Sequence, residues 1–156
     1  MSACMWEDQD LKKAYNSSTK ALNLDGSNLE ARWVRAQSSA LSNSSESIND
    51  LTYIVNNGGA SAKVYNAIGL VEQEIANNIY RFKRAKENTG FSDDNSVYTK
   101  EQTEIYNNAI VHYERAIIAF KKAIEVKPDT EPKLKYKIKD SERNINEIRE
   151  SIKELK

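Results

Sequence analysis

Apolar and small residues recur along the chain at the spacing of one helix face. The clearest case is the stretch 116–128, in which Ala116 and Ala123 flank Phe120 and Pro128 follows five residues later. Positions i, i+4 and i+7 share a helix face, and small residues on that face let a neighbouring helix approach and receive the large side chain. Proline ends the helix because it lacks a backbone donor. The stretch predicts the second helix of a helical hairpin.

Three weaker copies of this pattern precede it, and each is closed by glycine. They consist of Ala14, Ser18, Ala21 and Gly26; of Ser47, Leu51, Ile54 and Gly59; and of Asn78, Phe82, Ala85 and Gly90. The copies begin about 34 residues apart, which is typical of a helical repeat. A closing glycine predicts a left-handed cap after each helix. We therefore expect four second helices, at residues near 14–26, 47–59, 78–90 and 116–128.

First helices are predicted at 29–41 and 62–75, where apolar residues again share a face. That face holds Trp33, Ala36 and Ala40 in the earlier helix, and Tyr65, Ile68, Gly69, Glu72 and Ile75 in the later one. Glycine inside a helix costs about 1 kcal/mol relative to alanine. Gly69 therefore predicts a close crossing with another helix.

The last third of the chain predicts two long helices. No turn chemistry interrupts Tyr98 to Lys127, which we interpret as the fused first and second helices of the last repeat. The second of these helices begins with Asp129 or Thr130 as N-cap and Pro132 in the first turn. Apolar residues and one serine then follow a period near 3.5, at Leu134, Ile138, Ser141, Ile145, Ile148, Ile152 and Leu155. This helix either packs back along the preceding one as a cap or forms a coiled-coil seam with another chain.

Two of these motifs resemble those of the tetratricopeptide repeat family. Tyr65-x2-Ile68-Gly69 resembles its first-helix motif, and Ala116-x3-Phe120-x2-Ala123-x4-Pro128 resembles its second-helix motif. The resemblance covers residues 10–128. It implies an all-α superhelix of stacked antiparallel helical hairpins, with a long penultimate helix and a C-terminal capping helix. Residues 1–128 would form a repeat domain of about three to four repeats, the first incomplete, and 129–156 a capping or coiled-coil-like helix.

Composition supports a helical protein and excludes some partners. The chain has five Gly and two Pro, and its 23 Lys and Arg balance its 23 Asp and Glu, so we expect no nucleic-acid partner. No apolar run reaches the roughly 20 residues of a transmembrane helix. Cys4 is the only cysteine, which rules out an internal disulfide. We expect Cys4 to be an ordinary thiol and the protein to be cytoplasmic. The alternative applies if a signal sequence precedes Cys4: Met1–Cys4 is then the end of a bacterial lipoprotein signal, and the protein faces the periplasm.

Catalytic and metal-binding patterns are lacking in the sequence. His112 is the only histidine and has no nucleophile motif to serve, so we interpret it as structural or surface-exposed. The stretch 93–104 resembles a calcium loop at three places, but valine and tyrosine occupy the fifth and sixth positions, where an oxygen ligand and a glycine are needed. Helix capping by Ser96 or Thr99 explains it better. The basic cluster 81–86 is interpreted as a solvated face. We expect neither enzyme activity, nor a cofactor, nor a metal site.

The resemblance implies a non-catalytic adaptor that binds a peptide or partner helix on a concave face lined by first helices. The candidate binding residues are Arg32, Arg35, Lys63, Asn66 and Gln73. Trp33, Tyr65, Phe82 and Phe120 are expected in the core. The alternative is a self-associating or lipid-anchored scaffold, a possible homo-oligomer in which the C-terminal helices are the oligomerisation element.

Overall fold

A computed structural model describes the backbone of residues 3–87 and 95–155 and the side chains of 9–81 and 100–155. In this part the chain consists of helices joined by short turns. No strand occurs there, which confirms the all-α prediction. The elements are α1 (Ala3–Leu24), α2 (Leu29–Ser39), α3 (Ser44–Ile54), a π turn (Val55–Gly59), α4 (Ala62–Glu87), α5 (Asn95–Val126), a 3-10 turn (Pro128–Thr130) and α6 (Glu131–Glu154).

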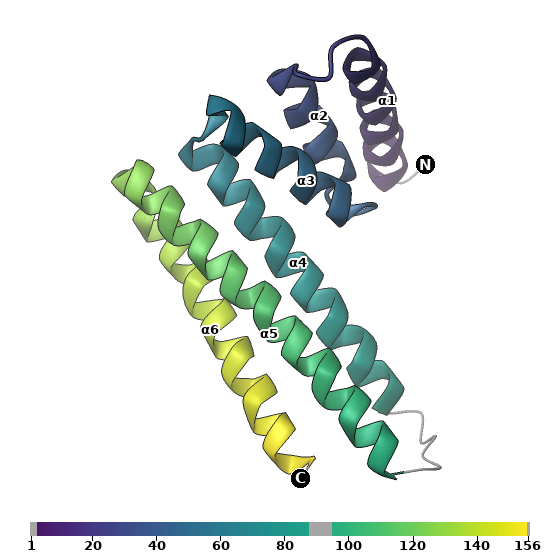
Figure 1. Cartoon of the computed structure of the whole chain (residues 1–156), viewed down its shortest axis with the longest axis vertical. Coiled ribbons are helices and arrows are strands. Elements are labelled where there is room, and N and C mark those ends of the chain that lie inside the picture. Colours follow the sequence, from purple (N-terminus) through teal and green to yellow (C-terminus); the bar gives the residue numbers. More distant parts are fainter. Residues whose placement is uncertain (1–2, 88–94, 156) are drawn as a thin grey trace.

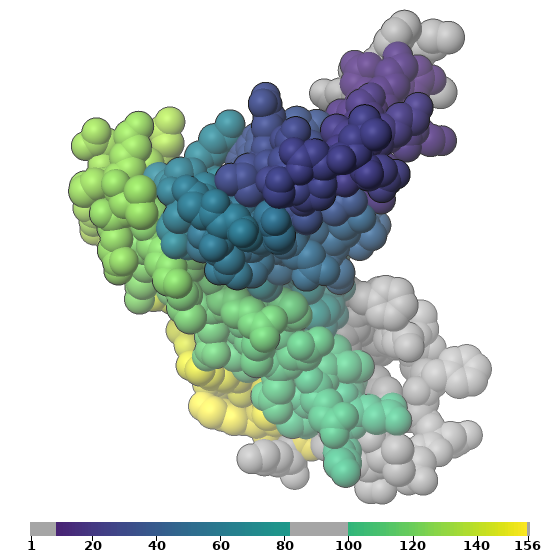
Figure 2. All heavy atoms as spheres, turned by 45° about the horizontal axis from the view of Figure 1, so that its top comes forward, coloured from purple at the N-terminus to yellow at the C-terminus, as the bar shows by residue number. Residues whose placement is uncertain are grey.

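Each helix packs against the one that follows it in the chain (Figure 1). Helices α4, α5 and α6 run side by side as three long rods, and α5 lies between and against both of the others. Helices α1–α3 form a shorter group at one end of these rods (Figure 2). The architecture is therefore a series of helical hairpins, of which the two formed by α4, α5 and α6 are the longest.

Helix α4 approaches α5 closely at Gly69. A Cβ atom placed on this glycine would lie 2.4 Å from Cε1 of Phe120, so no larger residue fits without displacing that ring. Phe120 and its two small neighbours, Ala116 and Ala123, are completely buried. The helix crossing predicted from Gly69 is thus confirmed, and its partner is the large residue of the clearest repeat pattern.

The predicted helix break between 75 and 78 is wrong, because α4 continues without interruption from Ala62 to Glu87. The pattern at 78–90 is therefore not a separate second helix. No Gly or Pro lies between Gly69 and Glu87, so the backbone has no reason to turn there. The single long helix predicted up to Lys127 is confirmed as α5, which forms one arm of a hairpin with α4.

The pattern in α3 is confirmed, but its glycine has a different role. Ser47, Leu51 and Ile54 are buried, and the Ser47 hydroxyl donates to the Ala36 carbonyl at 2.7 Å, which brings α3 close to α2. The left-handed residue after α3 is Gly58, with φ 87°, and neither Gly26 nor Gly59 adopts that conformation. Gly59 is needed for space, because its Cβ would lie 2.5 Å from Cγ2 of Ile54.

Helix α6 packs its apolar face back along α5, which is the first of the two alternatives that the sequence left open. Leu134, Ser141, Ile145 and Ile148 are buried, and Ile138, Ile152 and Leu155 are partly buried. Their neighbours on α5 include Tyr106, Tyr113 and Ile117. Thr130 occupies the N-cap position, but its hydroxyl donates to the Lys127 carbonyl instead of capping the helix.

Replacing Gly69 by leucine tests the helix crossing. The added side chain collides with Phe120, and overpacking of a tight core costs about 1–3 kcal/mol. We expect Gly69→Leu to lower the free energy of unfolding by that amount in urea titrations followed by circular dichroism. Leu70→Ala is the matched control, since Leu70 is the adjacent residue and is 39% exposed. Equal stability of the Gly69→Leu variant and the wild type would contradict the crossing.

Candidate functional site

Helices α2, α4 and α6 share one surface of the molecule. Lys63 of α4 places Nζ 4.4 Å from the ring centroid of Trp33 on α2, and Gln73 of α4 donates from Nε2 to Oγ of Ser141 on α6 at 3.2 Å. Most of α4 packs on α3 and α5, and these two side-chain contacts link it to α2 near its beginning and to α6 farther along. We define the α2/α4/α6 face as the surface formed by a seam of six residues together with the exposed side of α6. The seam residues are Trp33, Lys63, Asn66, Leu70, Gln73 and Tyr80.

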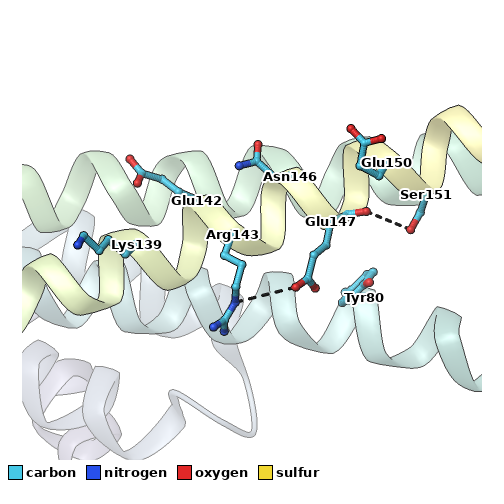
Figure 3. A pocket seen from close by; sticks show the side chains of 8 residues that line it. All are labelled: Tyr80, Lys139, Glu142, Arg143, Asn146, Glu147, Glu150 and Ser151. Carbon is cyan, nitrogen blue, oxygen red and sulfur yellow. Dashed lines mark hydrogen bonds and ion pairs between the residues drawn. The ribbon is translucent and has the colours of Figure 1, made fainter.

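A groove follows this seam on the α6 side (Figure 3). It encloses about 860 Å³ between Tyr80 of α4 and one side of α6. The α6 residues are Lys139, Glu142, Arg143, Asn146, Glu147, Glu150 and Ser151. All but Ser151 are exposed, and Figure 3 shows Arg143 and Glu147 directed toward one another, at 4.0 Å between Nε and Oε1. We call this feature the α4/α6 groove; it is open, polar and charged.

Arg32 and Arg35, two of the predicted binding residues, hold a buried carboxylate. Asp50 of α3 is 1% exposed and accepts from Nη1 of Arg32 at 2.9 Å. It also accepts from Nε and Nη2 of Arg35 at 2.7 and 2.8 Å. Such a buried carboxylate is stable only when it is paired and hydrogen-bonded in this manner.

The remaining donors of both guanidinium groups are also largely engaged. Arg32 donates to the Gly26 carbonyl at 2.6 Å and lies 3.6 Å from the ring centroid of Tyr53. Arg35 lies 3.6 Å from Glu46, and its hydrogen bonds to Asp50 raise the pKa of its guanidinium. The cluster joins α2 to α3 and to the turn before α2. Sequence reasoning missed Asp50 because only the folded chain places this aspartate beside the two arginines.

The other three predicted residues lie together on α4. Lys63 is exposed, whereas Asn66 and Gln73 are half-buried. The Oδ1 atom of Asn66 is buried and has no hydrogen-bond partner in the described part of the chain, although a buried acceptor normally has one. Lys63, Asn66 and Gln73 thus lie on the α2/α4/α6 face, whereas Arg32 and Arg35 bind Asp50 within the chain. Binding by any of the five stays a prediction.

A polar network that the sequence did not indicate joins the three long helices. The Tyr113 hydroxyl on α5 donates to Oδ1 of Asn77 on α4 at 2.6 Å and accepts from Nδ2 of Asn144 on α6 at 3.2 Å. Tyr113 is 1% exposed, and burial raises the pKa of its hydroxyl to about 12. A tyrosine within an apolar helix face was the only signal, and it does not reveal two amide partners.

His112 pairs with a buried glutamate rather than facing solvent alone. Its Nδ1 lies 2.6 Å from Oε2 of Glu72, and Glu72 is 5% exposed. The pair connects α4 to α5, so His112 has a structural contact, as the sequence interpretation allowed. Within the described residues no group of three or more His, Cys, Asp or Glu side chains is placed to hold a metal ion.

Several sequence predictions fall on side chains outside the described part. These are Cys4, Phe82, the basic residues at 83–86 and the capping residues Ser96 and Thr99. Arg81, the first residue of the basic cluster, is exposed. In the described part of the chain, no helix is both long enough and apolar enough to span a membrane.

Comparisons with protein-family models, with curated proteins and with solved structures find no match for this chain. The residues and their geometry are therefore the whole basis for interpreting its function.

Removing the Asp50 carboxylate tests whether the arginine cluster stabilises the fold. Asp50→Ala removes the buried carboxylate that two partly buried guanidinium groups share, and breaking a buried ion pair costs about 3–5 kcal/mol. We expect the urea midpoint to fall accordingly, whereas the exposed control Asp129→Ala changes it little. An Asp50→Ala variant as stable as the wild type would show that the cluster does not hold the hairpin.

Replacing Tyr113 by phenylalanine tests the polar network through pH. The folded state favours the neutral hydroxyl, so its contribution to stability is complete below pH 10 and is lost as the pH rises from 10 through about 12. Tyr113→Phe should be less stable at pH 7, by about 1 kcal/mol for the lost hydrogen bonds. Its unfolding free energy should also fall less steeply than that of the wild type above pH 10. Parallel pH dependences would contradict the raised pKa.

Proposed function

We propose that this chain is a non-catalytic protein-interaction module that binds its partner on the α2/α4/α6 face. The observation that supports this most directly is that α4 presents Lys63, Asn66 and Gln73 in a row on the face that leads to Tyr80, the α4 residue at the edge of the α4/α6 groove. Exposed Leu70 and half-buried Trp33 add apolar surface to the same seam. Mixed polar and aromatic surfaces of this kind are typical of interaction sites.

The resemblance to the tetratricopeptide repeat family supports the same choice of surface. In that family the first helices of the hairpins line the concave binding face, and here α2 and α4 would be first helices. The two motifs that carry the resemblance meet in space, because Gly69 of the first lies against Phe120 of the second. In this interpretation α4 and α5 are one repeat whose two helices are lengthened, and α6 is the terminal cap.

The residues of α4 define what kind of partner this face suits. The Asn66 amide nitrogen can donate and the Gln73 amide oxygen can accept, which suits the alternating acceptors and donors of an extended peptide backbone. Lys63 supplies a positive charge for a carboxylate of the partner. The arginines at 32 and 35 contribute by holding α2 in place, since their donors already bind Asp50.

The alternative function, a self-associating or lipid-anchored scaffold, requires another surface than the apolar side of α6. That side is covered by α5 within the same chain. Self-association through α6 would therefore use its outer, charged side.

Affinity capture from a lysate of the source organism tests the proposal. The bait is the full chain, the face variant is Lys63→Ala/Asn66→Ala/Leu70→Ala, and the matched control is Ile118→Ala/Lys121→Ala/Glu125→Ala on the exposed side of α5. We expect a co-purifying protein whose recovery falls at least about tenfold in the face variant and is unchanged in the control. Both variants must first show wild-type circular dichroism.

Retention of every captured protein by the face variant would contradict binding on this face. Equal loss in both variants would also contradict it, because the control changes none of the seam residues.

A further inference from the structure

The turn between α3 and α4 contains the one asparagine of the chain that is followed directly by glycine. Asn57 and Gly58 lie in the π turn Val55–Gly59, after the last residue of α3 and before the first residue of α4. Both are exposed, as is Asn56. An asparagine followed by glycine loses its side-chain amide more readily than an asparagine followed by a larger residue. This turn therefore combines a reactive pair with free access of water.

The backbone of this pair lies outside both α-helices. Asn57 has φ −111° and ψ 29°, and Gly58 has φ 87° and ψ 4°, so neither residue continues α3. A Cβ atom placed on Gly58 would meet nothing within 4 Å. The surroundings of Gly58 are therefore open, and no side chain of its own crowds its backbone nitrogen.

The Asn57 side chain is held by a hydrogen bond at the surface. Its Nδ2 donates to the carbonyl of Tyr53 at 2.8 Å, and this bond is exposed. An exposed hydrogen bond adds little net stability, because water replaces it when it opens. Attack on the side chain also needs rotation about ψ of Asn57, so that the nitrogen of Gly58 reaches Cγ. Glycine permits this rotation with little strain, since it adopts most backbone conformations.

The Asp25–Gly26 pair, in the turn before α2, provides a comparison within the same chain. Oδ1 of Asp25 accepts from the hydroxyl of Ser27 at 2.6 Å and from its backbone nitrogen at 2.9 Å. The hydroxyl above all, and then the backbone nitrogen, lowers the pKa of this carboxyl group. A carboxylate resists attack by nitrogen, because its oxygen leaves only after protonation. The side chain of Asn57 is a neutral amide and lacks this protection.

We propose that Asn57 is a site of spontaneous deamidation, in which the backbone nitrogen of Gly58 displaces the side-chain amide. This nitrogen gives its proton to hydroxide and bonds to Cγ of Asn57, which closes a cyclic succinimide. The bond between Cγ and Nδ2 breaks, and Nδ2 takes up a proton and leaves as ammonia. Water then opens the ring, and no oxidant, reductant or metal takes part. The inference goes beyond the proposed function and does not rest on it.

The ring opens in two ways, with different effects on the chain. Addition of water at Cγ leaves an aspartate with the ordinary backbone. Addition at the main-chain carbonyl carbon leaves an isoaspartate, in which Cβ becomes part of the backbone and lengthens the turn. Gly59 has no space to shift toward α3, since a Cβ atom on it would lie 2.5 Å from Cγ2 of Ile54. Ile54 and Val64 belong to one core cluster across this junction, so we expect the isoaspartate to loosen the contact between α3 and α4.

Ageing of the purified full chain tests the proposal. The protein is kept in heavy-oxygen water at neutral and at mildly alkaline pH, and its proteolytic peptides are measured by mass spectrometry. We expect Asn57 to deamidate at least about tenfold faster than Asn56, because no side chain crowds the nitrogen that attacks it. The reaction should be faster at the alkaline pH, which favours loss of the proton from that nitrogen. Heavy oxygen in the product separates this reaction from any that occurs during digestion.

The test variant is Asn57→Gln, because its longer side chain closes a larger ring far more slowly. The matched control is Asn56→Gln, which changes the neighbouring exposed amide and leaves the Asn57–Gly58 pair intact. We expect the modification to be absent from the first variant and its rate to stay within about twofold of wild type in the second, as a surface substitution leaves the fold unchanged. Circular dichroism checks that both variants are folded.

An Asn57 that keeps its amide in the folded chain, but loses it in urea, would overturn the inference, because the turn would then protect the residue. Equal rates at Asn56 and Asn57 would overturn it too. Urea titration of the isoaspartate form, separated by ion exchange, measures the effect on the junction. We expect a lower midpoint than that of the fresh protein, and an unchanged midpoint would contradict the loosening of α3 from α4.

Discussion

The contact between Gly69 and Phe120 is the constraint on which the arrangement of the long helices depends. Because no side chain fits at residue 69, the backbone of α4 lies directly against the Phe120 ring. Ala116 and Ala123 keep the surface of α5 equally close on either side of that ring. This contact sets the register of α4 on α5, and the register in turn places Glu72 beside His112 and Asn77 beside Tyr113.

The sequence predicted well those features that depend on one helix face. Gly69 and Phe120, the apolar residues of α6 and the buried positions of α3 could all be found from spacing, because burial repeats with the helical period. The division of 62–90 into two helices was wrong, since the same spacing also fits one continuous helix. The left-handed caps predicted at Gly26 and Gly59 were wrong. Gly59 leaves space for the side chain of Ile54, and Gly26 lies in the turn before α2.

The candidate site was less predictable, because it depends on residues that are remote in sequence. Arg32 and Arg35 were predicted to contact a partner, but the folded chain places Asp50 against both of their guanidinium groups. Asn77 and Asn144 gave no signal, since an isolated amide on a helix is uninformative without its partner across the interface. In contrast, Lys63, Asn66 and Gln73 lie near one another because they are on one helix, where spacing alone determines proximity, and binding by them stays a prediction.

The unequal lengths of the hairpins imply an uneven distribution of local stability along α4 and α5. Helix α4 packs on α3, but farther along α4 and α5 extend beyond the group α1–α3 (Figure 1). Toward that far end α4, α5 and α6 pack on one another without α1–α3, through an apolar cluster that includes Ala76, Tyr106 and Ile148 and through the tilted rings of Tyr80 and Tyr106, whose centroids are 6.1 Å apart. Opening of the backbone should therefore begin at the far end, and amide protons should exchange with solvent progressively more slowly toward Gly69.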